Sequence, residues 1–179
     1  KNDGVSDVMR RDYSVELSGG KPNSLGRTEE IVRRVRRDRT LLRPLFDTLR
    51  SDDELVRLRA GDALEKVCRE QPGWFGPYFN RLTSEIAAID QPSVQWHLAQ
   101  IFGEMSLSAS RYAVAKRILQ RNLDRSNDWI VLNVTMQQLF DWSGNDPALR
   151  HWLAPRLERL SRDRRGSVAA RARKLTHSL

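Results

Sequence analysis

The feature of this sequence that most restricts its fold is a repeat of 37 or 38 residues. Four segments place an equivalent valine in one column, and these valines are separated by 38, 37 and 37 residues: Val56, Val94, Val131 and Val168. A repeat of this length is typical of chains that stack one supersecondary unit on the next.

Within each segment, further positions repeat four, seven and eleven residues after the valine. This spacing follows one face of an α-helix. In the first segment the positions hold Ala60, Ala63 and Val67, whereas the third segment departs from the pattern with Thr135 and Gln138. The repeat therefore predicts four helices, each with one buried stripe.

Other helices are expected between these four. Apolar residues recur at three and four positions in residues 40–51, 75–89, 111–123 and 147–161, and residues 28–40 favour one more helix. Short polar segments, such as SDD at 51–53 and SND at 126–128, supply residues that cap helix N-termini. No stretch has the pattern of a strand.

One repeat matches a known motif residue by residue. The pattern D-x-x-V-R-x-x-A-x-x-A-L is matched by Asp53, Val56, Arg57, Ala60, Ala63 and Leu64. The chain therefore resembles the HEAT-repeat family of armadillo-type α-solenoids over about residues 40–179. The resemblance implies an all-α, right-handed α-solenoid of about four HEAT-like helix pairs, with an N-terminal helix and an irregular arm. We expect a loosely ordered arm over residues 1–23 and a single repeat domain over residues 24–179.

Composition narrows the functional classes. The single cysteine, Cys68, rules out an internal disulfide, and the three histidines lack the spacing of a helical metal site. Catalytic and phosphate-binding motifs are missing, so we expect no enzyme activity, no cofactor and no metal. Without a long apolar run or a secretory leader, we expect no membrane partner and a cytoplasmic location.

The resemblance also implies a binding face, because the second helices of HEAT repeats line the concave side. One column beside the buried stripe holds Leu58, Trp96 and Asn133, and the next holds Asp62, Gln100 and Gln137. Exposed aromatic residues are favoured at protein interfaces. The leading hypothesis is a non-catalytic scaffold that binds a protein or peptide through these residues, although a solvated face without function gives the same pattern.

The alternative hypothesis is nucleic-acid binding. Residues 111–179 hold fourteen Lys or Arg against six Asp or Glu, which accounts for the formal net charge of +8. The candidates for phosphate contacts lie near the C-terminus: Arg164, Arg165, Arg171, Arg173 and Lys174. A second arginine cluster, at residues 33–39, is expected to be neutralised locally by Glu29, Glu30 and Asp38.

A third hypothesis is an enzyme with the same architecture. The HEAT-like alkylpurine DNA glycosylases carry an aspartate flanked by tryptophans on a basic concave face. This chain offers Asp128 beside Trp129 and Asp141 beside Trp142. A helix cap explains Asp128 better, and core packing explains Trp142 better.

Overall fold

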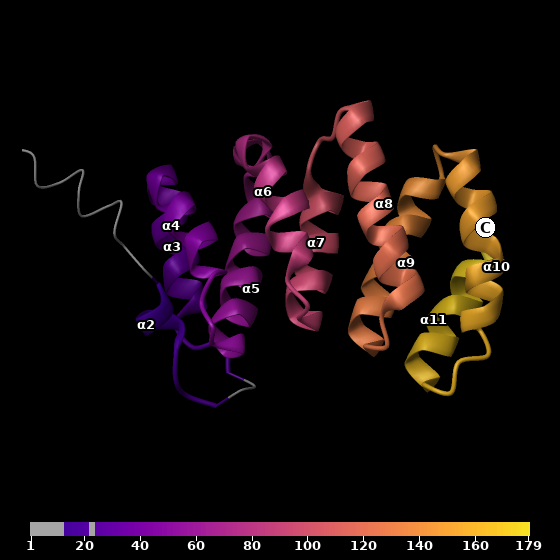
Figure 1. The fold of residues 1–179 in the computed structure, drawn as a ribbon, viewed down its shortest axis with the longest axis horizontal. Helices are drawn as coiled ribbons and strands as arrows, with labels where there is room; N and C mark the ends of the chain where they lie inside the picture. Colours follow the sequence, from indigo (N-terminus) through magenta and orange to yellow (C-terminus); the bar gives the residue numbers. More distant parts are fainter. Residues whose placement is uncertain (1–12, 22–23) are drawn as a thin grey trace, which may run out of the picture. The chain divides into compact units, whose positions relative to one another are not determined.

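The computed structural model describes residues 13–21 and 24–179, and every regular element within them is a helix (Figure 1). The all-α class is therefore confirmed over the described residues. The chain forms two compact units, Lys1–Ser106 (unit 1) and Leu107–Leu179 (unit 2). The solenoid arrangement, its handedness and the single domain over residues 24–179 stay predictions.

Unit 1 is organised around the long helix α5, which packs against α3, α4 and α7. Its α-helices are α2 (Ser14–Leu17), α3 (Thr28–Arg37), α4 (Leu42–Thr48), α5 (Glu54–Glu70), α6 (Phe79–Ser84) and α7 (Pro92–Glu104). Short 3-10 turns connect them: η1 (Arg39–Leu41), η2 (Pro72–Trp74), η3 (Gly76–Tyr78) and η4 (Ile86–Ala88).

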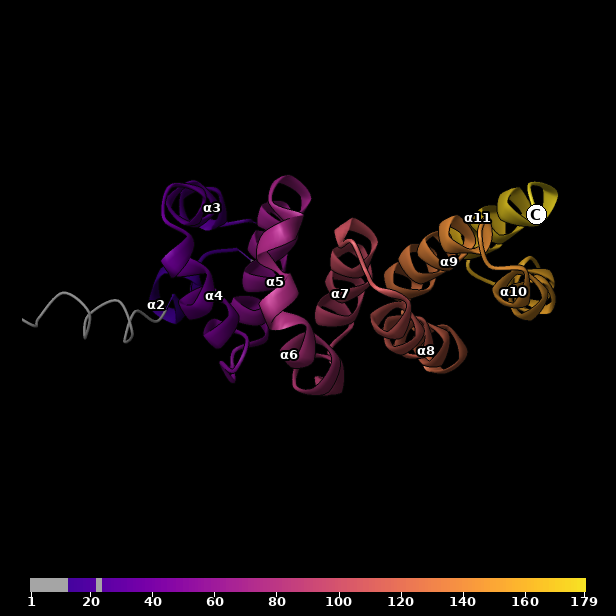
Figure 2. The same cartoon turned by 90° about the horizontal axis from the view of Figure 1, so that it is seen from above.

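Unit 2 consists of two helix pairs. Its elements are α8 (Ala109–Arg125), α9 (Trp129–Ser143), α10 (Pro147–Leu160) and α11 (Gly166–His177). Helix α9 packs against the other three. Within this unit α9 and α11 lie on one side, and α8 and α10 lie on the other (Figure 2).

The predicted stripe is buried in all four repeated helices. Val56, Val94, Val131 and Val168 are exposed by 1%, 2%, 0% and 0%. The small residues four positions later, Ala60 in α5 and Ala172 in α11, are fully buried and allow neighbouring helices to approach closely. Three later positions, Gln138, Trp142 and Leu179, are only half-buried. The column prediction therefore holds best in the first two turns of each helix.

Side chains cap several helices where the polar segments predict it. The Asp53 carboxylate accepts hydrogen bonds from the amides of Leu55 and Val56 at 2.8 and 3.4 Å. Asp128 does the same for Ile130 and Val131 at 2.8 and 2.9 Å. Each cap satisfies amides that lack a partner within the helix. The caps therefore explain why α5 and α9 begin where they do.

The described part of the expected loose arm is packed against α5. Tyr13 and Leu17 are fully buried, and the guanidinium of Arg59 in α5 is buried beneath the segment. Arg59 donates hydrogen bonds to the carbonyls of Leu17, Gly19, Ser24 and Lys21 at 2.6, 2.7, 3.0 and 3.1 Å. The arm prediction for residues 1–12 and 22–23 lies outside the described residues.

A glycine makes this wrapping possible. Gly26 has a φ of 55°, in the left-handed region, and a Cβ atom there would lie 3.2 Å from Cζ of Arg59. A side chain at this position would meet both backbone strain and the buried guanidinium. A glycine at residue 26 therefore lets the segment close over Arg59 without this strain.

Candidate binding surfaces

The first predicted contact region lies on α5 and α7, which pack directly against each other. We use the name α5–α7 surface for Leu58, Asp62, Trp96 and Gln100, all of which are half-buried. Asp62 pairs with Lys66 at 2.9 Å, and Lys66 also pairs with Glu29 of α3. The large apolar side chains that are exposed among the described residues lie elsewhere, at Val15, Leu25 and Trp129.

His97 sits behind this surface, where the sequence pattern does not predict it. Only 8% of the residue is exposed, and this burial lowers the pKa of its imidazole to about 4. Gly61 of α5 faces the ring so closely that a Cβ atom would lie 2.8 Å from Nδ1. A glycine in the middle of a helix is the one sequence signal for this close approach. His97 therefore serves the packing of α5 on α7.

The second region lies on α9 and α11. We use the name α9–α11 surface for Asn133, Gln137, Asp141, Arg171 and Lys174. The Arg171 guanidinium donates a hydrogen bond to Gln137 at 2.7 Å, and the Gln137 amide donates one to Asp141 at 2.8 Å. Gln137 belongs to the predicted protein-binding set and Arg171 to the predicted nucleic-acid set. The structure thus brings members of both sets together on one surface.

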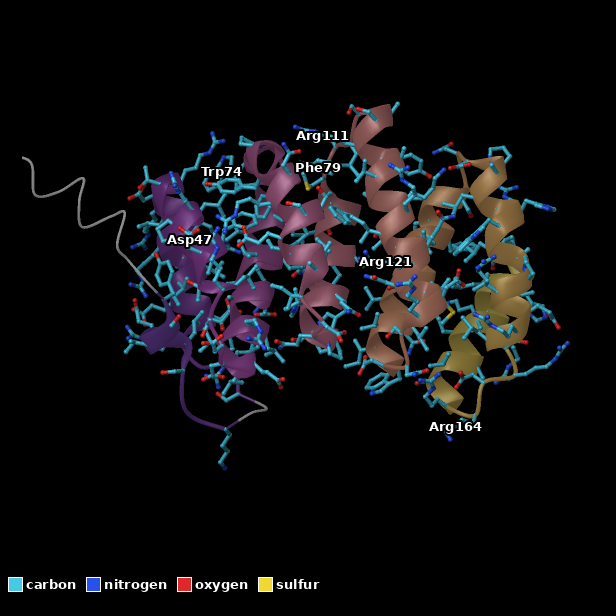
Figure 3. The ribbon with its side chains drawn as sticks, in the orientation of Figure 1. Asp47, Trp74, Phe79, Arg111, Arg121 and Arg164 are labelled. Carbon is cyan, nitrogen blue, oxygen red and sulfur yellow. The ribbon has the colours of Figure 1, made fainter. Side chains whose placement is uncertain are left out.

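The remaining basic candidates differ in how firmly they are held. Arg165 pairs with Asp163 at 2.7 Å and also donates to the carbonyl of Asn127. The hydrogen bond from Arg165 lowers the pKa of Asp163 to about 2. Arg173 donates to the carbonyl of Ser161 at 2.9 Å. Arg164, labelled in Figure 3, and Lys174 are exposed, with no side-chain partner among the described residues.

All six carboxylates of unit 2 are engaged within the unit. Asp124 pairs with Arg156, Glu158 with Arg162, Asp163 with Arg165, and Asp146 with Lys116. Asp128 caps α9, and Asp141 accepts from Gln137. By contrast, five exposed basic side chains have no partner among the described residues: Arg117, Arg125, Arg150, Arg164 and Lys174. The excess positive charge of unit 2 therefore faces solvent.

The arginine cluster at residues 33–39 is neutralised only in part as its sequence suggests. Glu29 pairs with Lys66, and Glu30 pairs most closely with Arg27, at 2.8 Å. Arg36 reaches Glu70 of α5 instead. Four exposed arginines consequently have no carboxylate within 4.0 Å among the described residues: Arg33, Arg37, Arg39 and Arg43. Local pairing still accounts for Arg34, which lies 3.8 Å from Glu30, and Arg33 interacts electrostatically with Glu29 and Glu30. It does not account for Arg36, whose partner belongs to another helix.

The two aspartate–tryptophan pairs have structural roles. Asp128 is the cap of α9, as expected, and Asp141 is hydrogen-bonded to Gln137. Trp142 is half-buried and meets Tyr112 edge-on, with ring centroids 5.1 Å apart. Trp129, in contrast, is 51% exposed. It lies one helical turn before Asn133, whose side-chain oxygen is buried without a hydrogen-bond partner.

We also looked for pockets, metal sites and membrane-spanning helices among the described residues. An open hollow of about 320 Å³ in unit 2 is lined mainly by Phe140, Asp141, Arg150 and Leu179. Three or more His, Cys, Asp or Glu side chains nowhere gather closely enough to hold a metal ion within residues 13–21 and 24–179. In the same residues, no helix has the length and apolar character needed to cross a membrane.

Comparison with known proteins adds no family. No protein-family model matches the chain, and neither a curated protein nor a solved structure matches it. The HEAT-repeat resemblance accordingly stays a sequence-based prediction.

Proposed function

We propose that this chain is a non-catalytic binding module that holds nucleic acid by its phosphate backbone through the basic side chains of unit 2. One observation carries the proposal. Residues 107–179 hold fourteen basic and six acidic side chains, and every acidic one already has a partner inside the unit. Exposed, uncompensated arginines and lysines attract a polyanion and release its condensed counterions.

The α9–α11 surface and the α10–α11 loop supply the phosphate contacts in this proposal. Arg164 and Lys174 are exposed and their side chains form no ion pair within 4.0 Å and no hydrogen bond among the described residues, so phosphate binding breaks none. Arg171 is oriented by Gln137 at 2.7 Å, which reduces the entropy lost when it meets a phosphate. Contacts of this kind carry no sequence information.

The second candidate function is binding of a protein or peptide, which was the first hypothesis drawn from the sequence. The exposed indole of Trp129 favours it, because Trp129 lies on α9 one turn before Asn133, a residue of the predicted protein-binding set. Tryptophans rank among the strongest contributors to protein interfaces. The α5–α7 surface remains part of this hypothesis.

The test is a salt titration of duplex DNA binding by the full chain. The variant Arg164→Glu with Lys174→Glu is compared with Arg33→Glu with Arg37→Glu, which reverses the same number of exposed charges in unit 1. We expect the unit 2 variant to bind more weakly and its log–log salt slope to fall by about one unit for each phosphate that is no longer bound. The unit 1 variant should keep a slope closer to that of the wild type.

Unchanged affinity and slope in the unit 2 variant would exclude phosphate binding at these residues. Nuclease treatment of a pulldown separates the two candidates. A partner that survives nuclease but is lost with Trp129→Ala belongs to the protein-binding alternative.

A further inference from the structure

Four aromatic residues lie close together in the uncharged segment QPGWFGPYF, residues 71–79 of unit 1. Phe75 and Phe79 are buried, with exposures of 0% and 5%, whereas Trp74 and Tyr78 are half-buried. Prolines begin η2 and lie within η3, which restricts the backbone. The two buried rings therefore anchor the segment and leave Trp74 and Tyr78 partly exposed. Trp74 and Phe79 are labelled in Figure 3.

Two arginines from η1 and α4 adjoin these rings. The guanidinium carbon of Arg39 lies 5.7 Å from the centroid of the Trp74 ring. The positive charges of Arg39 and Arg43 act on the Tyr78 hydroxyl, whose pKa is raised by burial and partly lowered again by these arginines. We use the name Trp74 surface for Arg39, Arg43, Trp74 and Tyr78.

The charge at the Trp74 surface is uncompensated, although residues 1–106 contain equal numbers, seventeen each, of basic and acidic residues. The neighbouring Arg81 is neutralised by Asp47 at 2.9 Å and by Glu85 at 3.2 Å. Arg39 and Arg43 are exposed and have no carboxylate within 4.0 Å among the described residues. An anionic ligand would relieve the mutual repulsion of these guanidiniums.

The rings of Trp74 and Tyr78 are also held in place by neighbouring side chains. Tyr78 stacks on Phe46 with centroids 4.3 Å apart and an interplanar angle of 6°, so the buried Phe46 holds the plane of the tyrosine. The guanidinium of Arg39 lies over the Trp74 ring. Aromatic rings beside cationic side chains are the combination that binds unpaired bases together with their phosphates.

We propose that the Trp74 surface binds single-stranded nucleic acid, with phosphates on Arg39 and Arg43 and a base stacked against Trp74. Bases in a duplex are stacked on each other and are not free to meet this ring, so the surface discriminates against duplex. This goes beyond the function proposed for unit 2, where phosphate contacts do not distinguish the two forms. An acidic peptide offers negative charge to the two arginines, but it has no base that could stack on the ring.

The experiment measures binding of the full chain to a short fluorescein-labelled oligo(dT) strand and to a duplex of the same length, by fluorescence anisotropy. Trp74→Leu should weaken single-strand binding about five- to a hundredfold and leave duplex binding unchanged. Arg39→Gln with Arg43→Gln should lower the single-strand salt slope by about 0.7 for each phosphate that is no longer bound. The matched control, Arg33→Gln with Arg37→Gln, should do neither.

Three results would overturn the inference: wild-type single-strand affinity in Trp74→Leu, equal weakening of strand and duplex in that variant, or competition by polyglutamate as effective as unlabelled oligo(dT). Helical circular dichroism verifies folding, and the double arginine variant keeps the test decisive if Trp74→Leu unfolds.

The variant Arg164→Glu with Lys174→Glu separates the two proposals. Loss of its duplex binding with retained single-strand preference locates the two activities in different units.

Discussion

At the scale of single residues, Gly61 determines how closely α5 can approach α7. Its missing side chain makes room for the ring of His97, since a Cβ atom would lie 2.8 Å from Nδ1 and 3.3 Å from Cγ. The ring is buried, with only 8% of the residue exposed. Packing of this kind leaves little freedom to absorb even one methyl group.

Gly61→Ala should therefore destabilise the protein by about 1–2 kcal/mol. Overpacking a buried contact costs about 1–3 kcal/mol, and the higher helix propensity of alanine offsets up to about 1 kcal/mol of this. Urea unfolding followed by circular dichroism measures the change. Gly73→Ala is the control, because a Cβ atom there has no neighbour within 4 Å. Equal stability of the two variants would show that His97 moves aside without cost.

At the scale of elements, Arg59 joins the N-terminal segment to α5. It donates to four carbonyls of residues 17–24, and the farthest of them lies 42 positions away in sequence. A buried guanidinium without its acceptors is costly, and the carbonyls in turn depend on it. The segment and α5 should therefore unfold together.

Arg59→Met should lower the free energy of unfolding by about 2–4 kcal/mol, because several hydrogen bonds to a charged group are lost at once. The loss should appear locally as faster hydrogen exchange at the amides of Leu17 and Ser18, which end α2. Arg43→Met, which removes an exposed arginine of the same unit, should change neither quantity. Retained protection at Leu17 in the Arg59 variant would mean that Tyr13 and Leu17 hold the segment by apolar packing alone.

At the scale of the whole molecule, charge is divided between the two units. Residues 1–106 have a formal net charge of zero and residues 107–179 one of +8. Like charges on a compact unit repel and reduce its stability, and salt screens them over a Debye length of about 10 Å at 0.1 M. Only unit 2 has a large excess to screen.

Raising potassium chloride from about 50 to 200 mM should therefore slow hydrogen exchange in unit 2 more than in unit 1. Buried amides of α9 and of α5 provide the two readouts. A short polyphosphate should also slow hydrogen exchange in unit 2, and at lower ionic strength, because it binds directly to the basic side chains whose repulsion salt screens. An equal response of the two helices would contradict an electrostatic difference between the units.

Local patterns were sufficient to predict the helices and their buried faces. The column through Val56 and Val168 and the cap at Asp128 depend on residues within one helix, so they can be recognised from spacing alone. The same reasoning failed for Arg36 of α3. It considered partners one helical turn away, whereas Arg36 pairs with Glu70, 34 positions on.

The sequence by itself determined that the described chain is helical, where its repeated helices lie and which faces they bury, because helix periodicity and capping act over a few residues. Only the tertiary structure decided which charges are neutralised and which are exposed. It brought Arg59 against the carbonyls of Leu17 and Ser24, His97 against Gly61 and Arg39 against Trp74. Coulombic and packing interactions depend on distance in space, and the order of residues along the chain does not specify it.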